Sequence, residues 1–209
     1  MHITHPKIGT YLERLAATRD PVLREMETIA RRRGFPIIGP HVGALLCQLA
    51  MISGARRILE MGSGYGYSAS WFARGLARGG RIICSDGSEE NAQAARSFFR
   101  RQGIAGRIQY IVGDALEILG GLRGTFDIIL NDVDKEDYPR VLPKVLPRLR
   151  RGGILVTDNM LWNGWVVQGD RSASTRGVAR LTRMLYASED LLTTLLPIRD
   201  GLTISVKIR

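Results

Sequence analysis

The sequence predicts an α/β protein with a doubly wound, mostly parallel β-sheet. Short apolar runs typical of buried strands alternate with longer segments of helical periodicity, a pattern expected of parallel strands joined by helices. The last two apolar runs are separated only by Arg199-Asp200-Gly201, a sequence typical of a hairpin turn. We therefore expect the C-terminal strands to join one edge of the sheet as an antiparallel hairpin.

Helices account for the N-terminal part of the chain. Apolar residues recur at helical spacing over residues 7–33 and 40–54. We expect residues 1–54 to form helices that cover the functional site. Residues 55–209 are expected to form the sheet-bearing core, within a single domain over residues 1–209.

The remaining elements follow as alternating strands and helices. The expected strands cover residues 56–62, 80–86, 107–114, 126–132, 153–159, 191–198 and 202–208. The expected helices cover residues 68–77, 88–103, 115–122, 138–153 and 175–188. Ser88 is typical of a helix N-cap, Gly103 is typical of a helix end, and Gly152-Gly153 closes a helical segment that contains prolines.

The composition is that of an ordinary globular protein. A length of 209 residues and a hydrophobic fraction of 44% suffice for a domain with a sizeable core. The N-terminal segment lacks the apolar core of a signal peptide, and the longest apolar stretch, VGALLCQLAMISGA, is too short to span a bilayer. Cys47 and Cys84 stand apart among apolar neighbours, which predicts reduced core thiols. These features predict a cytoplasmic protein that does not use a membrane.

The chain carries a net charge of +10, and most of its positive charge is arginine. Such a charge would suit RNA or another polyanion as a partner. The arginines are spread from Arg14 to Arg209, however, and only Arg31-Arg32-Arg33 form a tight run. A general preference for arginine over lysine is the favoured interpretation, and nucleic-acid binding stays open as the alternative.

Glycines, acids and amides stand where the expected strands end. They are Glu60 to Gly66, Asp86, Gly113-Asp114, Asp132 to Lys135 and Asp158-Asn159. Because ligands of doubly wound sheets bind beyond the carboxyl ends of the strands, we expect these residues to meet at one edge of the sheet.

The segment EMGSGYGYS, residues 60–68, carries Gly62, Gly64 and Gly66. Glycines permit a tight strand-to-helix turn whose backbone approaches a ligand closely, although any α/β protein can use such a turn. Asp86, at the end of the next strand, is placed to accept the ribose hydroxyls of a nucleoside. The dinucleotide fingerprint has its third glycine one residue further on, so the spacing favours S-adenosylmethionine over NAD and leaves a dehydrogenase as a remote alternative.

The segment ILNDVDKEDYP, residues 129–139, gathers acids where a strand leaves the core. Asp132 and Asp158 end neighbouring strands, and Asn159 follows directly. Two carboxylates and one amide oxygen suit Mg²⁺, with Mn²⁺ or Ca²⁺ as alternatives, although the acids could equally be polar caps of strand ends. A zinc site is not indicated, because the histidines lie far from these acids in sequence: His2, His5 and His41.

Five segments carry a further signal: ILEMGSGYGYSASWFA, GDALEIL, FDIILNDVDKEDYP, TDNMLWNG and LLPIRDGLTIS. They resemble, in order, the motifs of the cation-dependent O-methyltransferases, the family of catechol and caffeoyl-CoA O-methyltransferases and many small bacterial relatives. The resemblance begins at about residue 36 and runs to the end of the chain. It implies a Rossmann-like class I methyltransferase fold, with a seven-stranded, mostly parallel sheet, helices on both faces and an antiparallel C-terminal hairpin. It also implies S-adenosylmethionine, a divalent cation and a homodimer.

The resemblance implies roles for the acidic residues. Asp132, Asp158 and Asn159 match the family's metal ligands, and Lys135 matches its catalytic lysine. Asp134 matches an acid whose simplest role is support of the loop or the substrate. The remaining acids of the segment are expected to be solvated: Glu136 and Asp137.

The resemblance also implies a cofactor-binding set: Ile38, Glu60, Gly62, Gly64, Ser68, Asp86, Asp114, Ala115 and Asp132. Within this set, Ser68 and the glycines surround the methionine part of the cofactor, and Asp86 takes the ribose hydroxyls. Asp114 and Ala115 lie by the adenine, and the backbone at Ile38 reaches the cofactor. Trp162 either forms a wall on the acceptor side or packs as a core aromatic.

Three functions remain open. The favoured one is methylation of a hydroxyl on a catechol-like or other small aromatic acceptor. The alternative is methylation of a hydroxyuridine in tRNA, which bacterial relatives perform and which would gain support if Arg31-Arg32-Arg33, Arg171 and Arg176 ringed the site. A cofactor-binding protein without turnover is less expected, because the metal ligands and Lys135 are all present.

Two positions depart from the family pattern. Asn131 stands where an apolar residue usually precedes the first metal acid, and Gly87 stands where an apolar residue often packs near the adenine. The N-terminal region and the loop 163–176 shape the acceptor pocket, so the resemblance says least about the acceptor.

Overall fold

The computed structural model describes residues 5–209, and His2 lies outside the described residues. Its α-helices are α1 (Pro6–Leu15), α2 (Pro21–Arg33), α3 (Gly39–Ile52), α4 (Tyr67–Gly75), α5 (Glu89–Arg101), α6 (Ala115–Gly121), α7 (Tyr138–Val145), α8 (Trp165–Gln168) and α9 (Ala173–Ala187). Its strands are β1 (Arg57–Met61), β2 (Arg81–Asp86), β3 (Ile108–Val112), β4 (Phe126–Asn131), β5 (Leu149–Thr157), β6 (Leu191–Leu196) and β7 (Leu202–Lys207).

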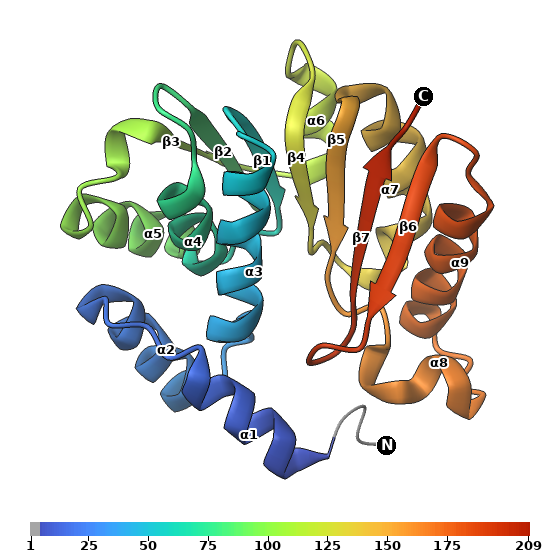
Figure 1. The fold of residues 1–209 in the computed structure, drawn as a ribbon, viewed down its shortest axis with the longest axis horizontal. Coiled ribbons are helices and arrows are strands. Elements are labelled where there is room, and N and C mark those ends of the chain that lie inside the picture. Colours follow the sequence, from blue (N-terminus) through green and yellow to red (C-terminus); the bar gives the residue numbers. More distant parts are fainter. Residues whose placement is uncertain (1–4) are drawn as a thin grey trace.

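The strands form one seven-stranded sheet in the order β3-β2-β1-β4-β5-β7-β6 (Figure 1). Strands β1 to β5 pair in parallel, whereas β7 runs antiparallel to both β5 and β6. This arrangement confirms the predicted Rossmann-like fold with a C-terminal hairpin. The chain changes direction across the sheet between β1 and β4, and a ligand site is expected at the carboxyl ends of these strands.

Helices cover both faces of the sheet. Neighbouring residues of a strand point to opposite faces, so Ile58 of β1 joins the core shared with α2, α3, α4 and α5. Leu59, the next residue, joins the core shared with α6, α7 and α9. The N-terminal helices α2 and α3 therefore share a hydrophobic core with the sheet.

The N-terminal helical region is divided into α1 and α2, where the sequence predicted helical character throughout residues 7–33. The break lies at Asp20, whose carboxylate accepts the N–H groups of Val22 and Leu23 at 2.8 and 3.2 Å and so caps a new helix. Pro21 occupies the first turn of α2, where it costs no helix hydrogen bond.

Strand β5 begins at Leu149, whereas the sequence predicted a helix up to residue 153. The helix α7 ends at Val145, and a short 3₁₀ turn, Leu146–Arg148, leads into the strand. Gly152 lies inside β5 with φ +74°, and the pairing with β4 is irregular there. Glycines that were expected to end a helix therefore form a bulge in a strand.

A row of polar side chains crosses the sheet beside the site. Asn131 of β4 is in register with Thr157 of β5, and Thr157 is in register with Thr203 of β7. All three residues are 0% exposed. Within residues 5–209, their side-chain polar atoms have no hydrogen-bond partner. Each such group costs about 1–3 kcal/mol of folding free energy when it is buried unpaired.

The composition predicted that the protein does not use a membrane and that its two cysteines are reduced core thiols. In the part of the chain that the structure describes, no helix has both the length and the apolar character needed to cross a bilayer. Cys47 and Cys84 are free thiols, with Cys84 buried in β2 and Cys47 half-buried in α3. Neither cysteine forms a disulfide, as predicted, but only Cys84 lies in the core as expected.

Candidate active site

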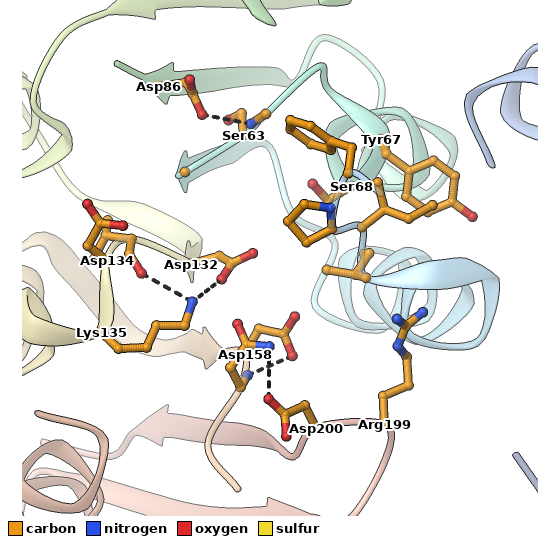
Figure 2. Close-up of a pocket in the computed structure, with 18 of the residues that line it drawn as sticks. Ser63, Tyr67, Ser68, Asp86, Asp132, Asp134, Lys135, Asp158, Arg199 and Asp200 are labelled. Carbon is orange, nitrogen blue, oxygen red and sulfur yellow. Dashed lines mark hydrogen bonds and ion pairs between the residues drawn. The ribbon is translucent and has the colours of Figure 1, made fainter. Parts of the chain in front are cut away.

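A cavity of about 790 Å³ lies at the carboxyl ends of the central strands (Figure 2). Its walls come from the turn between α2 and α3, the glycine loop after β1, the segments after β2, β4 and β5, and the tip of the β6–β7 hairpin. The residues singled out in the sequence that line it are Ile38, Gly62, Gly64, Ser68, Asp86, Asp132, Asp134, Lys135, Glu136, Asp137, Asp158, Asn159 and Trp162. These residues are scattered in the sequence and meet at one edge of the sheet.

A smaller cavity of about 280 Å³ shares Gly62, Asp86 and Asp132 with the larger one. It is lined by Asp114 and Ala115, the two residues expected beside an adenine. A nucleoside held at Asp86 could therefore extend from the smaller cavity into the larger one.

The loop after β1 depends on glycines in the left-handed region of backbone conformation. The φ angles are +86° at Gly62, +49° at Gly64 and +86° at Gly66. A Cβ atom on Gly62 would lie 2.2 Å from the carbonyl oxygen of Asp132, far inside contact distance. The N–H of Gly62 also donates to the carbonyl oxygen of Ser85 at 2.9 Å. The glycine at position 62 thus allows the loop to pack directly on the acidic segment.

Asp86 is fixed in place by three donors. Its Oδ2 accepts the N–H of Gly64 at 3.0 Å, and its Oδ1 accepts the N–H of Ser88 at 2.9 Å and the amide of Asn91 at 3.0 Å. A carboxylate has about four acceptor positions, so Asp86 keeps capacity for hydroxyl groups in the cavity.

Glu60 lines neither cavity and lies fully buried behind the glycine loop. Its carboxylate accepts the hydroxyl of Ser68, and the thiol of Cys84 donates to it at 3.9 Å. Burial raises the pKa of Glu60 to about 8, although the hydrogen bond from Ser68 opposes this rise. Any part that Glu60 takes in cofactor binding would therefore act through Ser68, which does face the cavity.

Lys135 stands at the centre of the acidic end of the cavity (Figure 2). Its Nζ donates to Oδ1 of Asp132 at 2.7 Å and to the carbonyl oxygen of Val133 at 3.2 Å. The same nitrogen lies 5.2 Å from the ring centre of Tyr138 and 5.7 Å from that of Trp162. A carboxylate and two aromatic faces thus hold the ammonium group in position.

Asp158 and Asn159 follow β5 next to Asp132. Burial, reinforced by the negative charge of Asp132, raises the pKa of Asp158 to about 7. Burial also raises the pKa of Asp132, and the Lys135 ammonium opposes this rise. When two carboxylates lie close together and partly shielded from water, each negative charge makes ionisation of the other less favourable. Asn159 has φ +57°, and its amide nitrogen donates to Oδ2 of Asp200 at 3.4 Å.

These residues fit a hard divalent cation. Asp132, Asp158 and Asn159 offer carboxylate and amide oxygens, the donors that Mg²⁺ and Ca²⁺ prefer. Because Asn159 directs its amide nitrogen at Asp200, its amide oxygen remains available. A cation would also offset the repulsion between the two acids. Within residues 5–209, no cluster of three or more His, Cys, Asp or Glu side chains is suited to metal binding, so water or substrate oxygens would have to complete the coordination.

The other acids of this segment differ in their surroundings. Glu136 is exposed, as expected. Asp137 was expected to be solvated, but it is half-buried and forms an ion pair with Arg140 at 2.6 Å. The carbonyl oxygen of Asp134 accepts the N–H of Asp137 at 3.0 Å, which supports the turn that carries Lys135.

Trp162 combines the two roles considered for it. Its ring lines the cavity beside Lys135 and also packs edge-on against Trp165, with 5.8 Å between the ring centres. Trp162 also packs, partly buried, against the core shared by α6, α7 and α9, so it is both a wall of the cavity and in part a core aromatic.

The tip of the β6–β7 hairpin also belongs to the site, although its sequence predicted only a turn. Arg199 and Asp200 both line the cavity. Oδ1 of Asp200 accepts the N–H of Asn163 at 2.5 Å, so the hairpin tip is joined to the segment after β5. The one sequence feature that could have indicated these residues is the charged pair Arg199-Asp200 inside the apolar segment LLPIRDGLTIS. Five other residues line the cavity without any sequence feature that would have indicated it: Phe35, Pro36, Ile37, Tyr67 and Ser174.

The arginines that were considered for RNA binding form no part of the wall of the larger cavity, although Arg176 borders a neighbouring hollow that shares Glu136 with it. Within the described residues, none of Arg31, Arg32, Arg33, Arg171 and Arg176 lines the larger cavity. The guanidinium of Arg176 donates instead to the carbonyl oxygen of Arg171.

Comparisons with known proteins agree with this geometry. Residues 13–208 match a family model described as O-methyltransferase. A catechol O-methyltransferase of Mycobacterium tuberculosis is 30% identical over 183 residues, which cover 86% of this chain and 83% of that protein. TomG, an O-methyltransferase of Streptomyces achromogenes solved with S-adenosylmethionine, has a TM-score of 0.88 at 30% identity, covering 97% of this chain and 96% of that one. A Bacillus cereus O-methyltransferase solved with S-adenosylhomocysteine has a TM-score of 0.87 at 29% identity, covering 96% and 97%.

Proposed function

The chain belongs to the O-methyltransferase family and is an S-adenosylmethionine-dependent methyltransferase, and on this premise we propose that it methylates a hydroxyl of a small, catechol-like aromatic acceptor with the help of a divalent cation. One observation carries the proposal: Asp86, Lys135 and the oxygens of Asp132, Asp158 and Asn159 border one cavity. A ribose-binding acid and a candidate metal set are thus within reach of one bound cofactor and one acceptor.

The cofactor would lie across both cavities. Its adenine would rest by Asp114 and Ala115 and its ribose hydroxyls on Asp86. The methionine part would follow the glycine loop to Ser68. This path directs the methyl group toward the acidic end of the larger cavity.

In the reaction, the acceptor oxygen attacks the methyl carbon in line with the sulfonium sulfur. The oxygen–carbon bond forms as the carbon–sulfur bond breaks, and S-adenosylhomocysteine leaves. A neutral phenol is a poor nucleophile near neutral pH, because its pKa is about 10. When bound, a divalent cation at Asp132, Asp158 and Asn159 would supply charge that stabilises the phenolate, and adjacent hydroxyls of a catechol suit it as ligands.

Lys135 has two possible roles beside that oxygen. A neutral amine would take the hydroxyl proton, whereas an ammonium would hold the phenolate by charge after the proton passes to solvent. The 2.7 Å ion pair with Asp132 stabilises the ammonium, so the anion-holding role is favoured.

Methyl transfer from labelled S-adenosylmethionine tests the proposal, with Mg²⁺ or with a chelator present. A catechol and undermodified bulk tRNA serve as parallel acceptors. We expect label on the catechol with Mg²⁺ and its loss with the chelator. Label on tRNA alone would replace this proposal with the RNA alternative, and chelator-resistant transfer to the catechol would remove the cation from it.

The homodimer and the cytoplasmic location implied earlier also remain proposals. The residues Ile8, Tyr11 and Leu15 of α1 are between 52% and 67% exposed, so this helix offers apolar surface to a second copy. Light scattering on the purified protein measures the oligomeric state, and a monomer at micromolar concentration would contradict the dimer.

A further inference from the structure

The tip of the β6–β7 hairpin carries an arginine in a strained backbone position. Arg199 has φ +51°, in the left-handed region that residues with side chains adopt at a cost. A Cβ atom on Gly39 would lie 1.9 Å from Nη1 of Arg199. The guanidinium thus occupies the space that any side chain at position 39 would fill, and it rests on the backbone at the start of α3.

The backbone around Arg199 is firmly attached to the candidate metal residues. The N–H of Met160 donates to the carbonyl oxygen of Gly201 at 2.9 Å, and the N–H of Leu161 donates to that of Asp200 at 2.8 Å. The segment that follows Asn159 and the hairpin tip therefore form one unit. These bonds hold the backbone at Arg199 in place relative to the position where the acceptor oxygen would react.

The charge of Arg199 has no partner in the described part of the chain. No carboxylate of residues 5–209 lies within 4.0 Å of its guanidinium, and its N–H groups make no hydrogen bond there. The neighbouring Asp200 is engaged by Asn159 and Asn163 instead. A planar guanidinium with free donors suits a carboxylate, which it binds through two parallel hydrogen bonds.

The cavity carries charges of both signs, and Arg199 lies close enough to Asp158 for its charge to oppose the rise in the pKa of that acid. The Asp132 and Asp158 end of the cavity is acidic, and an anionic substituent placed there would be repelled. Arg199 is at the opposite side of the cavity from Asp86, with its guanidinium directed along the wall toward α3 (Figure 2). An acceptor that carries a hydroxyl and an anionic group would be bound in one orientation.

We propose that Arg199 binds a carboxylate on the acceptor, so that the preferred substrates are hydroxylated aromatic carboxylates rather than neutral catechols. The inference rests on the proposed function, because it names the acceptor class of the same site. It assigns Arg199 to substrate selection and leaves the methyl transfer to the residues around Lys135.

The test compares catechols that carry a carboxylate on the ring, or through one or two methylene groups, with the corresponding primary amides. We expect the wild-type kcat/KM to be about tenfold or more higher for the best acid than for its amide. Arg199→Gln should bring this ratio close to one by slowing the acid alone, and Arg199→Lys should retain part of it. Arg183→Gln removes the same charge from α9, outside the cavity, and should leave the ratio unchanged.

Two results would overturn the inference. One is a wild-type ratio near one while neutral catechols are methylated, which leaves the proposed function intact. The other is equal loss of acid and amide turnover in Arg199→Gln, which would indicate a structural role. Arg199→Gly separates these roles, because it relieves the strained φ and should keep the free energy of unfolding while it abolishes the acid preference.

If no acceptor is methylated, the proposed function fails, but the role of Arg199 can still be tested by measuring how tightly the acids and amides bind. The same acid and amide pairs are then titrated by calorimetry into the protein loaded with S-adenosylhomocysteine and Mg²⁺. Tighter binding of the acid that is lost in Arg199→Gln would support the inference, and equal binding of acid and amide would overturn it.

Discussion

The ammonium nitrogen of Lys135 lies 2.7 Å from Oδ1 of Asp132, so the candidate catalytic lysine and the candidate metal acid form one ion pair. The carbonyl oxygen of the same Asp132 lies where a side chain on Gly62 would have to be. The glycine loop after β1 and the acidic end of the cavity are therefore in direct contact. A change on one side of this contact is expected to affect the other side.

Lys135→Ala should lower kcat by at least about a hundredfold, because it removes the group that we propose holds the developing phenolate. Cofactor affinity should change little, since Lys135 stands on the acceptor side. Steady-state kinetics and calorimetric titration with S-adenosylmethionine measure the two effects. Lys144→Ala, an exposed position on α7, is the matched control, and undiminished turnover in Lys135→Ala would rule out the assigned role.

Asp86→Ala should weaken cofactor binding by about ten- to a hundredfold, because it removes the carboxylate that we propose accepts the ribose hydroxyls. Asp190→Ala serves as control, since Asp190 lines neither cavity. Circular dichroism should accompany the titration, as Asp86 also accepts the N–H groups of Gly64 and Ser88. A folded variant with wild-type affinity would exclude the ribose contact.

Gly62→Ala should lower the free energy of unfolding by about 2 kcal/mol or more, because the added methyl group meets the Asp132 carbonyl and φ is +86°. Gly106→Ala is the matched control, since a Cβ there has no atom within 4 Å. Urea unfolding of both variants measures the difference. Similar stability of the two would mean that the loop moves away from the acidic segment without cost.

Glu60 should make the apo-protein less stable as the pH rises. Its pKa is about 8 when folded, against 4.5 for an ordinary glutamate, so between these values the folded chain binds a proton that the unfolded chain has released. Stability therefore falls through this window and levels off above it. Glu60→Gln should flatten the curve and unfold at higher urea than wild type at pH 8, whereas both should respond alike below pH 4.

The exposed Glu189→Gln provides the control for this pH series, because its carboxylate lies outside the core. Parallel pH curves of the wild type and Glu60→Gln would show that Glu60 ionises in the folded protein without penalty. That result would contradict the burial argument.

The sequence predicted most of the fold because each strand and helix has a local pattern. The parallel sheet and its antiparallel hairpin were predicted, whereas the order of the strands was not, and the residues after the strand ends were correctly expected to meet at one edge. Boundaries were less predictable where one residue type serves two structures. Gly152 is typical of a helix end, yet in this chain it forms a bulge within β5.

The site was predictable where a chemical group must follow a strand, as for Asp86, Asp132 and Asp158. Arg199 and Asp200 were missed because a charged turn has no local feature that distinguishes a solvated hairpin from one that reaches a cavity. Only pairing of β7 with β5 brings that turn to the site, and this pairing joins residues far apart in the chain. Glu60 was expected among the residues that contact the cofactor, but it is buried behind Ser68 and lines neither cavity. Its burial depends on how the glycine loop packs, which the sequence pattern does not specify.

The buried polar row of Asn131, Thr157 and Thr203 is expected to lower the melting temperature of the protein. Valine has nearly the shape of threonine, so Thr157→Val and Thr203→Val would each remove an unpaired hydroxyl without opening a void. Each replacement is expected to raise Tm by about 2–4 °C, which corresponds to about 1 kcal/mol in a protein of this size. Calorimetric melting of the double variant measures the gain, and the row therefore offers a route to a heat-resistant methyltransferase whose cavity lining is unchanged.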